Sequence, residues 1–530
     1  MSVAAGKPGP HSSLGGLSRR SRDRHSSLRL GSRHSPLAFS AARFLLLAAL
    51  LGAPLAFGAV QPWAWASLAF AALLALLLWA AGNILQGELR IAWSPLYVPA
   101  ALFFLLAAVQ YAGRLTFDPM ATREALVKLA AYLIFFFLAA QLFQVSGVRR
   151  QVSGPGSSLI THHSSLLLVI SVYAFALGLF AMVQFFTSRG LIYWSISPRW
   201  GGWVFGPYVN HNHYAGLMEM LIPLAAAYVL WLPKSNPRRP LFGFAVVVLI
   251  ASLLLSGSRG GFLALLAEIL VFSAILFLAR GPRSLVVAAA TPMSGNSALG
   301  DLSRRSRDPH LTHYSSLVTR HSSPRLAVAL ALLSAALLFL YIEPGHISRR
   351  LATVFGVGVS YDEMIGDRKE AALAGLRMFR AHPWLGTGLG SYEIVAPRYR
   401  RTPSDLLWDH AHNDYAEALA ETGLVGALLV LCALVVFFWS LVTRHSSLLS
   451  DSALITRHSS LEPWTLDGLR LGAALGCIGL LVHSFSDFNL RIPANAAWFA
   501  FCAGVAVASA ASPSLAEPVP RDIAHVSQTV

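Results

Sequence analysis

Long apolar runs dominate this chain, and they restrict what it can fold into. About twelve of them are counted as spans, because runs of about 17–20 residues fit a hydrocarbon core of about 30 Å. The run 242–256 is short for a span. Soluble proteins carry about 25% charged residues, whereas this chain has 12% charged and 55% hydrophobic residues. The sequence therefore predicts an all-α polytopic membrane protein. The runs lie near residues 42–59, 64–82, 96–112, 124–144, 166–186, 214–231, 242–256, 262–279, 326–343, 423–442, 468–485 and 493–509.

The placement of Lys and Arg predicts the side of the membrane on which each loop lies. With the N-terminus inside, the inner loops and tails hold 23 of these residues and the short outer loops hold 6. We therefore expect both termini inside, and we expect the first run to remain as an anchor. The domains predicted are a basic Ser-rich tail, nine spans, an outer loop, three spans and a second tail, at 1–41, 42–343, 344–422, 423–509 and 510–530.

Near copies of a Thr-Arg-His-Ser-Ser pattern recur along the chain, and all of them fall in the predicted inner loops. They lie at 159–166, 317–324, 441–448 and 454–461. Their irregular spacing is not that of a repeat fold. We interpret them as insertions tolerated where the backbone is solvated, and the alternative is a basic site for anionic lipid.

The densest polar cluster, Asp409–Tyr415, stands directly before the apolar run that begins at Gly423. Polar density beside a bilayer is costly unless it has a function. His412 or His410 could act as a general base near neutral pH, and Asn413 and Tyr415 are candidate substrate-binding residues. The alternative is a helix cap with an interfacial histidine.

Several other polar residues are predicted at the same outer side. Arg259 lies in a Gly-rich turn, where its fork of donors suits a phosphate or anchors the chain at the interface. Arg368 opens an amphipathic helix expected over 366–380, in which Leu373, Leu376 and Phe379 share a face. Further candidate anion- or substrate-binding residues are Arg398, Arg401, Asn212 and His211, with a solvated surface or a helix cap as the structural alternative.

Two further clusters are expected to be structural. Glu219 and Glu268 fall inside predicted spans, where ionisable groups pair internally. The turn 483–495 should pack against the polar cluster.

Motifs for metal or nucleotide chemistry are missing from the sequence. It holds no Asp-x-Asp and no Gly-x4-Gly-Lys-Ser/Thr phosphate loop. His410 and His412 stand two residues apart, which is not the zinc-binding spacing. The cysteines, Cys432, Cys477 and Cys502, all lie in apolar runs. We therefore expect no metal, no cofactor and no nucleic-acid partner.

Taken together, these residues resemble the O-antigen ligase and polymerase family of bacterial membrane glycosyltransferases, over residues 44–508. The matching pieces are 54–58 with Trp63, 212–215, 258–260, Arg368, 382–390 and 410–413 with Glu421 and Gly423.

The resemblance implies transfer of a glycan from undecaprenyl diphosphate to an acceptor such as the lipid A core, without metal and with inversion. It also implies a protein of the bacterial inner membrane with a periplasmic active site. Arg259 and Arg368 would hold the diphosphate and His412, or else His410, would serve the acceptor hydroxyl.

Several alternatives remain open. Within the family, the protein could be an O-antigen or exopolysaccharide polymerase or a protein O-oligosaccharyltransferase. From another class, a transporter or lipid-glycan flippase should show similar halves around a central inner loop, which the sequence lacks. A structural membrane subunit would need neither Arg259 nor His412.

Overall fold

The structure is a computed structural model of the chain. It describes residues 37–87, 89, 91–143, 160–198, 203–279, 361–401, 409–450 and 462–508. The ninth predicted span, 326–343, lies outside the described residues, as do the repeat copies at 317–324 and 454–461 and the predicted tail 510–530.

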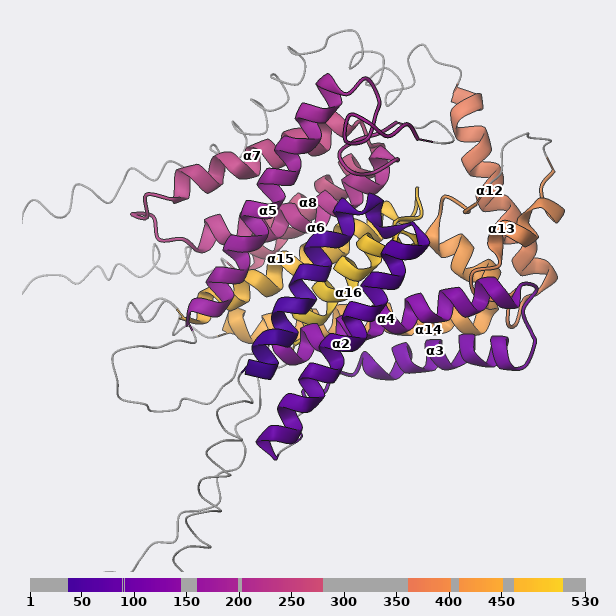
Figure 1. Ribbon diagram of the computed structural model, residues 1–530, viewed down its shortest axis with the longest axis horizontal. Coiled ribbons are helices and arrows are strands. Elements are labelled where there is room, and N and C mark those ends of the chain that lie inside the picture. Colours follow the sequence, from indigo (N-terminus) through magenta and orange to yellow (C-terminus); the bar gives the residue numbers. More distant parts are fainter. Residues whose placement is uncertain are drawn as a thin grey trace, which may run out of the picture.

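The described part of the chain is helical, without a β-strand (Figure 1). Eight helices are long and apolar enough to cross a membrane, and three shorter helices are also apolar. Together they coincide with every predicted run except 326–343, and the predicted all-α polytopic fold is confirmed. The helices are Leu37–Leu55, α2 (Pro62–Gln86), α3 (Tyr97–Ala112), α4 (Pro119–Leu142), α5 (Ile160–Thr187), α6 (His211–Trp231), α7 (Arg239–Ser256), α8 (Arg259–Ala279), α12 (Tyr361–Ala381), α13 (Tyr392–Val395), α14 (Asp414–Ser450), α15 (Glu462–His483) and α16 (Pro493–Val507), with short 3-10 turns η1 (Phe57–Ala59), η2 (Ala396–Arg398) and η4 (Asn489–Arg491).

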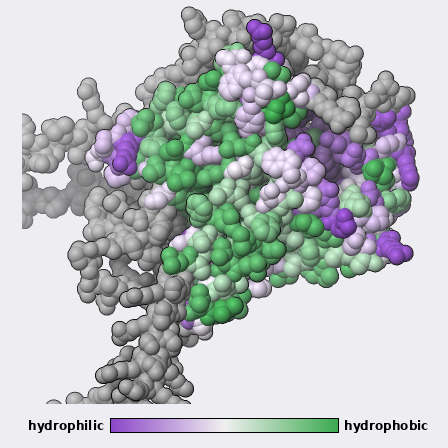
Figure 2. Space-filling view, in the orientation of Figure 1, coloured by the Kyte–Doolittle hydropathy of each residue, from purple (hydrophilic) through white to green (hydrophobic). Residues whose placement is uncertain are grey.

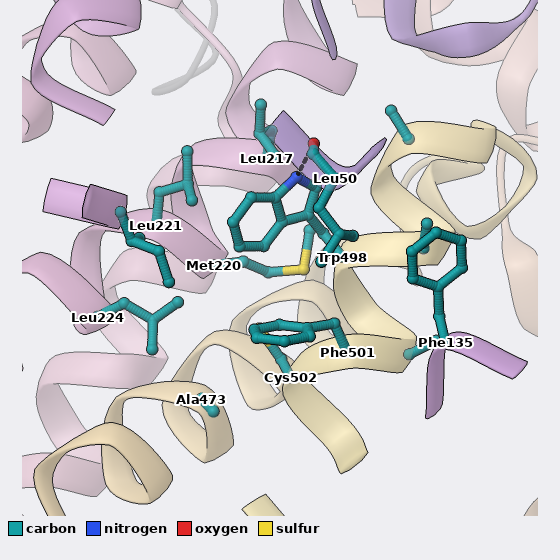
Figure 3. Close-up of a cluster of buried hydrophobic side chains, with 14 of the residues drawn as sticks. Leu50, Phe135, Leu217, Met220, Leu221, Leu224, Ala473, Trp498, Phe501 and Cys502 are labelled. Carbon is teal, nitrogen blue, oxygen red and sulfur yellow. Dashed lines mark hydrogen bonds between the residues drawn. The ribbon is translucent and has the colours of Figure 1, made fainter. Parts of the chain in front are cut away.

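Helix α6 is the centre of the bundle. In its 18-residue apolar stretch, 83% is buried inside the molecule. In no other candidate span does the buried share of such a stretch exceed 44%. Trp498 of α16 lies against Leu217, Met220 and Leu221 of α6 (Figure 3), and its Nε1 donates to the carbonyl of Leu50 at 2.8 Å. The indole therefore joins α6, α16 and the first helix around one core.

Side chains close the helix ends. Asp118 caps α4 by accepting from the backbone N–H of Met120 at 2.9 Å, and Asn210 caps α6 by accepting from Asn212 at 2.9 Å. At the C-terminal end of α4, Arg43 donates to the carbonyl of Leu142 at 3.1 Å. At the C-terminal end of α16, Arg470 donates to the carbonyl of Ala508 at 2.7 Å. These bonds satisfy groups that helix ends leave free, and the arginines also complement the helix dipole.

The polar segment between the spans contains α12, α13, η2 and the first turns of α14. Figure 2 shows hydrophilic residues gathered on the side where α12 and α13 lie, beside an apolar surface over the bundle. The predicted amphipathic helix exists as α12, but its predicted face is wrong. Ala371, Ala374 and Met378 are the buried residues and Leu376 is exposed, because α12 packs closely on α14 through small side chains.

Gly423 interrupts α14 with a backbone φ of 62° and ψ of −162°. Just after this break, Leu424 N–H donates to the carbonyl of Pro383 at 2.8 Å and Val425 N–H donates to that of Trp384 at 3.2 Å. The first turns of α14 thus belong with the polar segment, and the rest of the helix belongs with the membrane bundle.

Candidate functional site

Asp487, in the turn between α15 and α16, lies at the centre of the candidate site. Its Oδ1 is 3.5 Å from Nδ1 of His412 and 3.8 Å from Nε2 of His213, and its Oδ2 is 3.8 Å from Nη1 of Arg368. Burial alone would raise the pKa of Asp487, but the two imidazoles and the guanidinium outweigh burial and hold that pKa well below its usual range. A buried carboxylate therefore joins three segments that are distant in sequence.

His412 stands immediately before α14 in a constrained backbone conformation. Its φ is 50°, in the left-handed region, and histidine is one of the residues that tolerate this region better than most. Its side chain is 22% exposed. Its Nδ1 and Oδ2 of Asp487 have no hydrogen-bond partner among the described residues. Contacts of this length often shorten only when a substrate binds.

Asn413 is the residue that caps α14. Its Oδ1 accepts from the N–H of Ala416 at 2.9 Å, and its Nδ2 donates to the carbonyl of Phe485 at 2.9 Å. The helix-cap alternative for the polar cluster therefore applies to Asn413, and this cap fixes His412 beside it.

His410 is committed to a different carboxylate. Its Nδ1 lies 2.8 Å from Oε1 of Glu417, whose Oε2 accepts from the N–H of Ala411 at 2.8 Å. Burial alone would lower the pKa of His410, but the Glu417 carboxylate outweighs burial and raises that pKa. The Glu417 carboxylate therefore favours the protonated form of His410 and holds the partly exposed imidazole in place.

Arg491 completes this ion-pair network. Its Nε lies 3.1 Å from Oε1 of Glu417, and its Nη2 lies 2.6 Å from Oε2 of Glu421. Oε1 of Glu421 in turn accepts from the N–H of Tyr392 at 3.0 Å. The network ties the last outer turn and α13 to the start of α14.

Phe488 gathers three imidazole rings. The ring centroids of His213, His410 and His412 lie 4.7, 4.3 and 4.9 Å from its own. Phe488 is buried, so the histidines share an apolar wall beside Asp487.

Arg368 and the first turn of α8, in which Arg259 lies, both approach Ser486. Arg368, 40% exposed, donates from Nη1 to the carbonyl of Ser486 at 3.3 Å. Arg259 begins α8, where Ser258 Oγ accepts from the N–H of Gly261 at 3.1 Å. A Cβ on Gly260 would lie only 2.7 Å from Ser486 Oγ. The first turn of α8 and Arg368 therefore approach the same residue, and the Arg259 guanidinium pairs with no other described side chain.

The acidic residues predicted inside the spans behave differently from each other. Glu219 pairs with His483, with 2.7 Å between Oε1 and Nδ1, so the predicted internal pairing is confirmed. Glu268 is buried as well, but its Oε1 has no hydrogen-bond partner among the described residues.

Of the other predicted site residues, some are packed in the protein and others are exposed. Asn212 is buried at the start of α6, and the imidazole of His211 packs against Trp203. Tyr415 donates its hydroxyl to the carbonyl of Leu481 at 2.7 Å, which is a structural contact.

Arg398 and Arg401 are exposed, and within the described ranges neither forms an ion pair with the carboxylates near Asp487. Likewise, no group of three His, Cys, Asp or Glu side chains there is arranged to hold a metal ion.

Sequence reasoning missed His213, Asp487 and Phe488 as parts of the site. The signal was available in part, because the turn 483–495 was expected to pack against the polar cluster. What it did not reveal was that its aspartate would sit between His412 and Arg368.

The helices and this buried cluster define a polytopic membrane protein with a polar site at one end of the bundle. Residues 244–431, about a third of the chain, match the family model described as O-antigen ligase, which supports the resemblance to that family. No curated protein matched the chain in a sequence comparison. The matched range contains Arg259, Arg368 and His412, whereas His213, His483 and Asp487 lie outside it.

Proposed function

We propose that this protein transfers a glycan from undecaprenyl diphosphate to an acceptor hydroxyl at the periplasmic face of the inner membrane. The observation that carries this proposal is the position of Asp487 between His412 and Arg368. It brings a candidate base and a candidate anion-binding group into one cluster. A reaction in which an acceptor hydroxyl displaces a diphosphate from a sugar requires both the base and the anion-binding group.

The donor end of the site is formed by Arg259 and Arg368 around Ser486. Guanidinium groups bind phosphate oxygens with paired donors, and the N-terminus of α8 adds backbone N–H groups and a favourable dipole. These groups stabilise the charge that develops on the leaving diphosphate, which is the main electrostatic task of the reaction.

The acceptor end is formed by His412. With Nδ1 directed at Asp487, Nε2 is the nitrogen available to take the proton of the acceptor hydroxyl. The hydroxyl oxygen then attacks the anomeric carbon, and the bond from that carbon to the diphosphate breaks, with its electron pair leaving on the carrier. One such displacement inverts the configuration at the carbon.

His412 is a better candidate for the base than His410. Nδ1 of His410 is engaged by Glu417, and that carboxylate raises the pKa of His410, which favours the protonated form that cannot act as a base. His410 then serves to hold the loop in which His412 lies.

The acceptor decides between the members of the family. The lipid A core is the leading candidate, and a second carrier-linked glycan or a protein side chain would make the protein a polymerase or a protein O-oligosaccharyltransferase. A transporter or flippase would use the arginines but would need no base, so dependence on an acceptor separates the two classes.

The test mixes purified protein, lipid-linked oligosaccharide and candidate acceptors in the presence of a chelator. We expect His412→Ala to lower the transfer rate by about 10²- to 10⁴-fold, the contribution of a general base, and we expect Arg259→Ala and Arg368→Ala to weaken donor use. Arg123→Ala, at an exposed outer arginine of α4, is the matched control. Transfer by the His412→Ala protein at the wild-type rate would rule out this mechanism.

The proposed sidedness has its own test. In a protein whose native cysteines are replaced, a cysteine at position 405 should react with an impermeant thiol reagent in spheroplasts, and one at position 452 should not. The reverse labelling would place the site and both termini on the opposite sides.

A further inference from the structure

The most unusual pair in the membrane bundle is Glu219 of α6 with His483 of α15. Both side chains are almost fully buried, with His483 only 1% exposed, and 2.7 Å separates Oε1 of Glu219 from Nδ1 of His483. Ionisable residues at this depth are costly and generally functional. Neither takes part in the chemistry assigned to His412, Arg259 and Arg368.

The second nitrogen of His483 faces the candidate diphosphate site. A Cβ added to Gly260, the residue after Arg259, would collide with Cδ2 and Nε2 of His483 and would come within 2.7 Å of Ser486 Oγ. The imidazole edge, Ser486 and the first turn of α8 therefore meet at one point. Nε2 has no hydrogen-bond partner in the described part of the chain.

Glu219 determines which protons His483 carries. Its carboxylate accepts the Nδ1 proton, as second partners of functional histidines do. In the imidazolium form, the ring then offers its remaining N–H from Nε2 towards the turn that holds Arg259. The pair is neutral as a whole, which lowers the cost of keeping it within the bundle.

We propose that His483 is a third phosphate-binding group, which donates from Nε2 to an oxygen of the carrier diphosphate, and that Glu219 is its positioning residue. This inference rests on the proposed function, because it concerns the same diphosphate. It gives the end of α15 a role in binding the diphosphate, which a site made of the two arginines alone would not give it.

The charged groups around His483 fit an anion at this place. Arg368 and Arg259 supply two cations, and Asp487 and Glu219 supply two carboxylates that already have partners. Glu268 of α8, packed against Gly479 one turn before His483, is the remaining acidic group. A diphosphate would therefore add negative charge beside two guanidinium groups and one imidazolium.

The test measures binding of geranylgeranyl diphosphate and of geranylgeraniol to full-length protein in nanodiscs. His483→Ala should weaken diphosphate binding about tenfold, the effect of one lost hydrogen bond to a charged group, and should leave binding of the alcohol unchanged. His483→Gln puts an amide donor near the Nε2 position and should recover part of the affinity. His483→Asn puts its amide near the Nδ1 position and should not.

Glu219→Gln tests the positioning role. The amide can still accept from Nδ1, but the charge that favours the imidazolium is gone, so diphosphate affinity should fall more steeply as the pH rises than in the wild type. His382→Gln is the matched control, since that imidazole bonds to Tyr399 and packs against Phe117, and it should bind both probes as the wild type does.

The outcomes separate the two proposals. If Arg259→Ala weakens diphosphate binding but His483→Ala binds like the wild type, the role of His483 is refuted and the proposed function stands. If the wild type does not prefer the diphosphate to the alcohol, the diphosphate site itself is refuted. Equal losses for diphosphate and alcohol in His483→Ala would show a purely structural role and would also overturn the inference.

Discussion

Gly260 gives the sharpest test of how closely the first turn of α8 must approach α15. In Gly260→Ala the new methyl group would lie 2.7 Å from Ser486 Oγ and closer still to the His483 ring, whereas ordinary contact begins at 3.4 Å. The contact with the His483 ring is the shorter of the two, so the turn or the ring must shift to relieve it. The ring cannot simply swing away, because Glu219 holds its Nδ1.

A displacement of about 1 Å in a positioning element can cost about 10²-fold in rate. We expect Gly260→Ala to lower kcat/KM for the lipid-linked donor by about that factor, because Arg259 moves with the turn. The measurement is the initial rate of transfer against donor concentration at saturating acceptor.

Gly243→Ala is the matched control, because a Cβ at that position in α7 meets nothing within 4 Å. If the collision with His483 is the cause, Gly260→Ala should add little to the loss already caused by His483→Ala, since coupled sites are not additive. Wild-type kinetics for Gly260→Ala, or losses that multiply in the double variant, would refute this reasoning.

Two further predictions concern the ion pairs around Glu417. Arg491→Met leaves Glu417 and Glu421 buried without their guanidinium partner and should lower the free energy of unfolding by about 3–5 kcal/mol. The measurement is a denaturant titration in detergent. Arg491→Lys should recover part of the lost free energy, and an unchanged free energy in Arg491→Met would contradict the network. Because the pKa of His410 is raised in the folded protein, its stabilising effect is fully present below about pH 6.5 and is lost as the pH rises through the raised pKa. The stability gap between wild type and His410→Gln should therefore shrink from pH 6 to pH 9, and a constant gap would count against the pair.

The spans were predictable because the bilayer fixes the length and composition of each helix. The alternation of sides also predicted that residues near 211, 259, 412 and 483 lie at one end of the bundle. The contacts made there by Gly260, His213 and Asn413 agree with that grouping.

The partners within that group could not be predicted. Asp487 meets His412 across 75 positions because the start of α14 is bonded to the turn after α15, through Asn413 Nδ2 to the carbonyl of Phe485 and the N–H of Asp414 to that of Ser484. Hydropathy carries no information on which segments are neighbours. The face of α12 was misjudged for a related reason. Leucine and phenylalanine mark apolar surface, but a close approach to α14 requires alanines.

Two glycines, Gly423 at the break in α14 and Gly386 packed against it, limit how this region can be exchanged when the acceptor is to be changed. A Cβ on Gly423 would lie 2.5 Å from the carbonyl of Trp384, and one on Gly386 would lie 2.5 Å from the amide of Thr422. The backbone of 383–388 is therefore fitted directly to that of 421–425. Exchanging one of these stretches for that of a relative, without the other, would separate surfaces that no side chain can bridge. A chimaera designed to alter acceptor choice should move 382–425 as a single cassette.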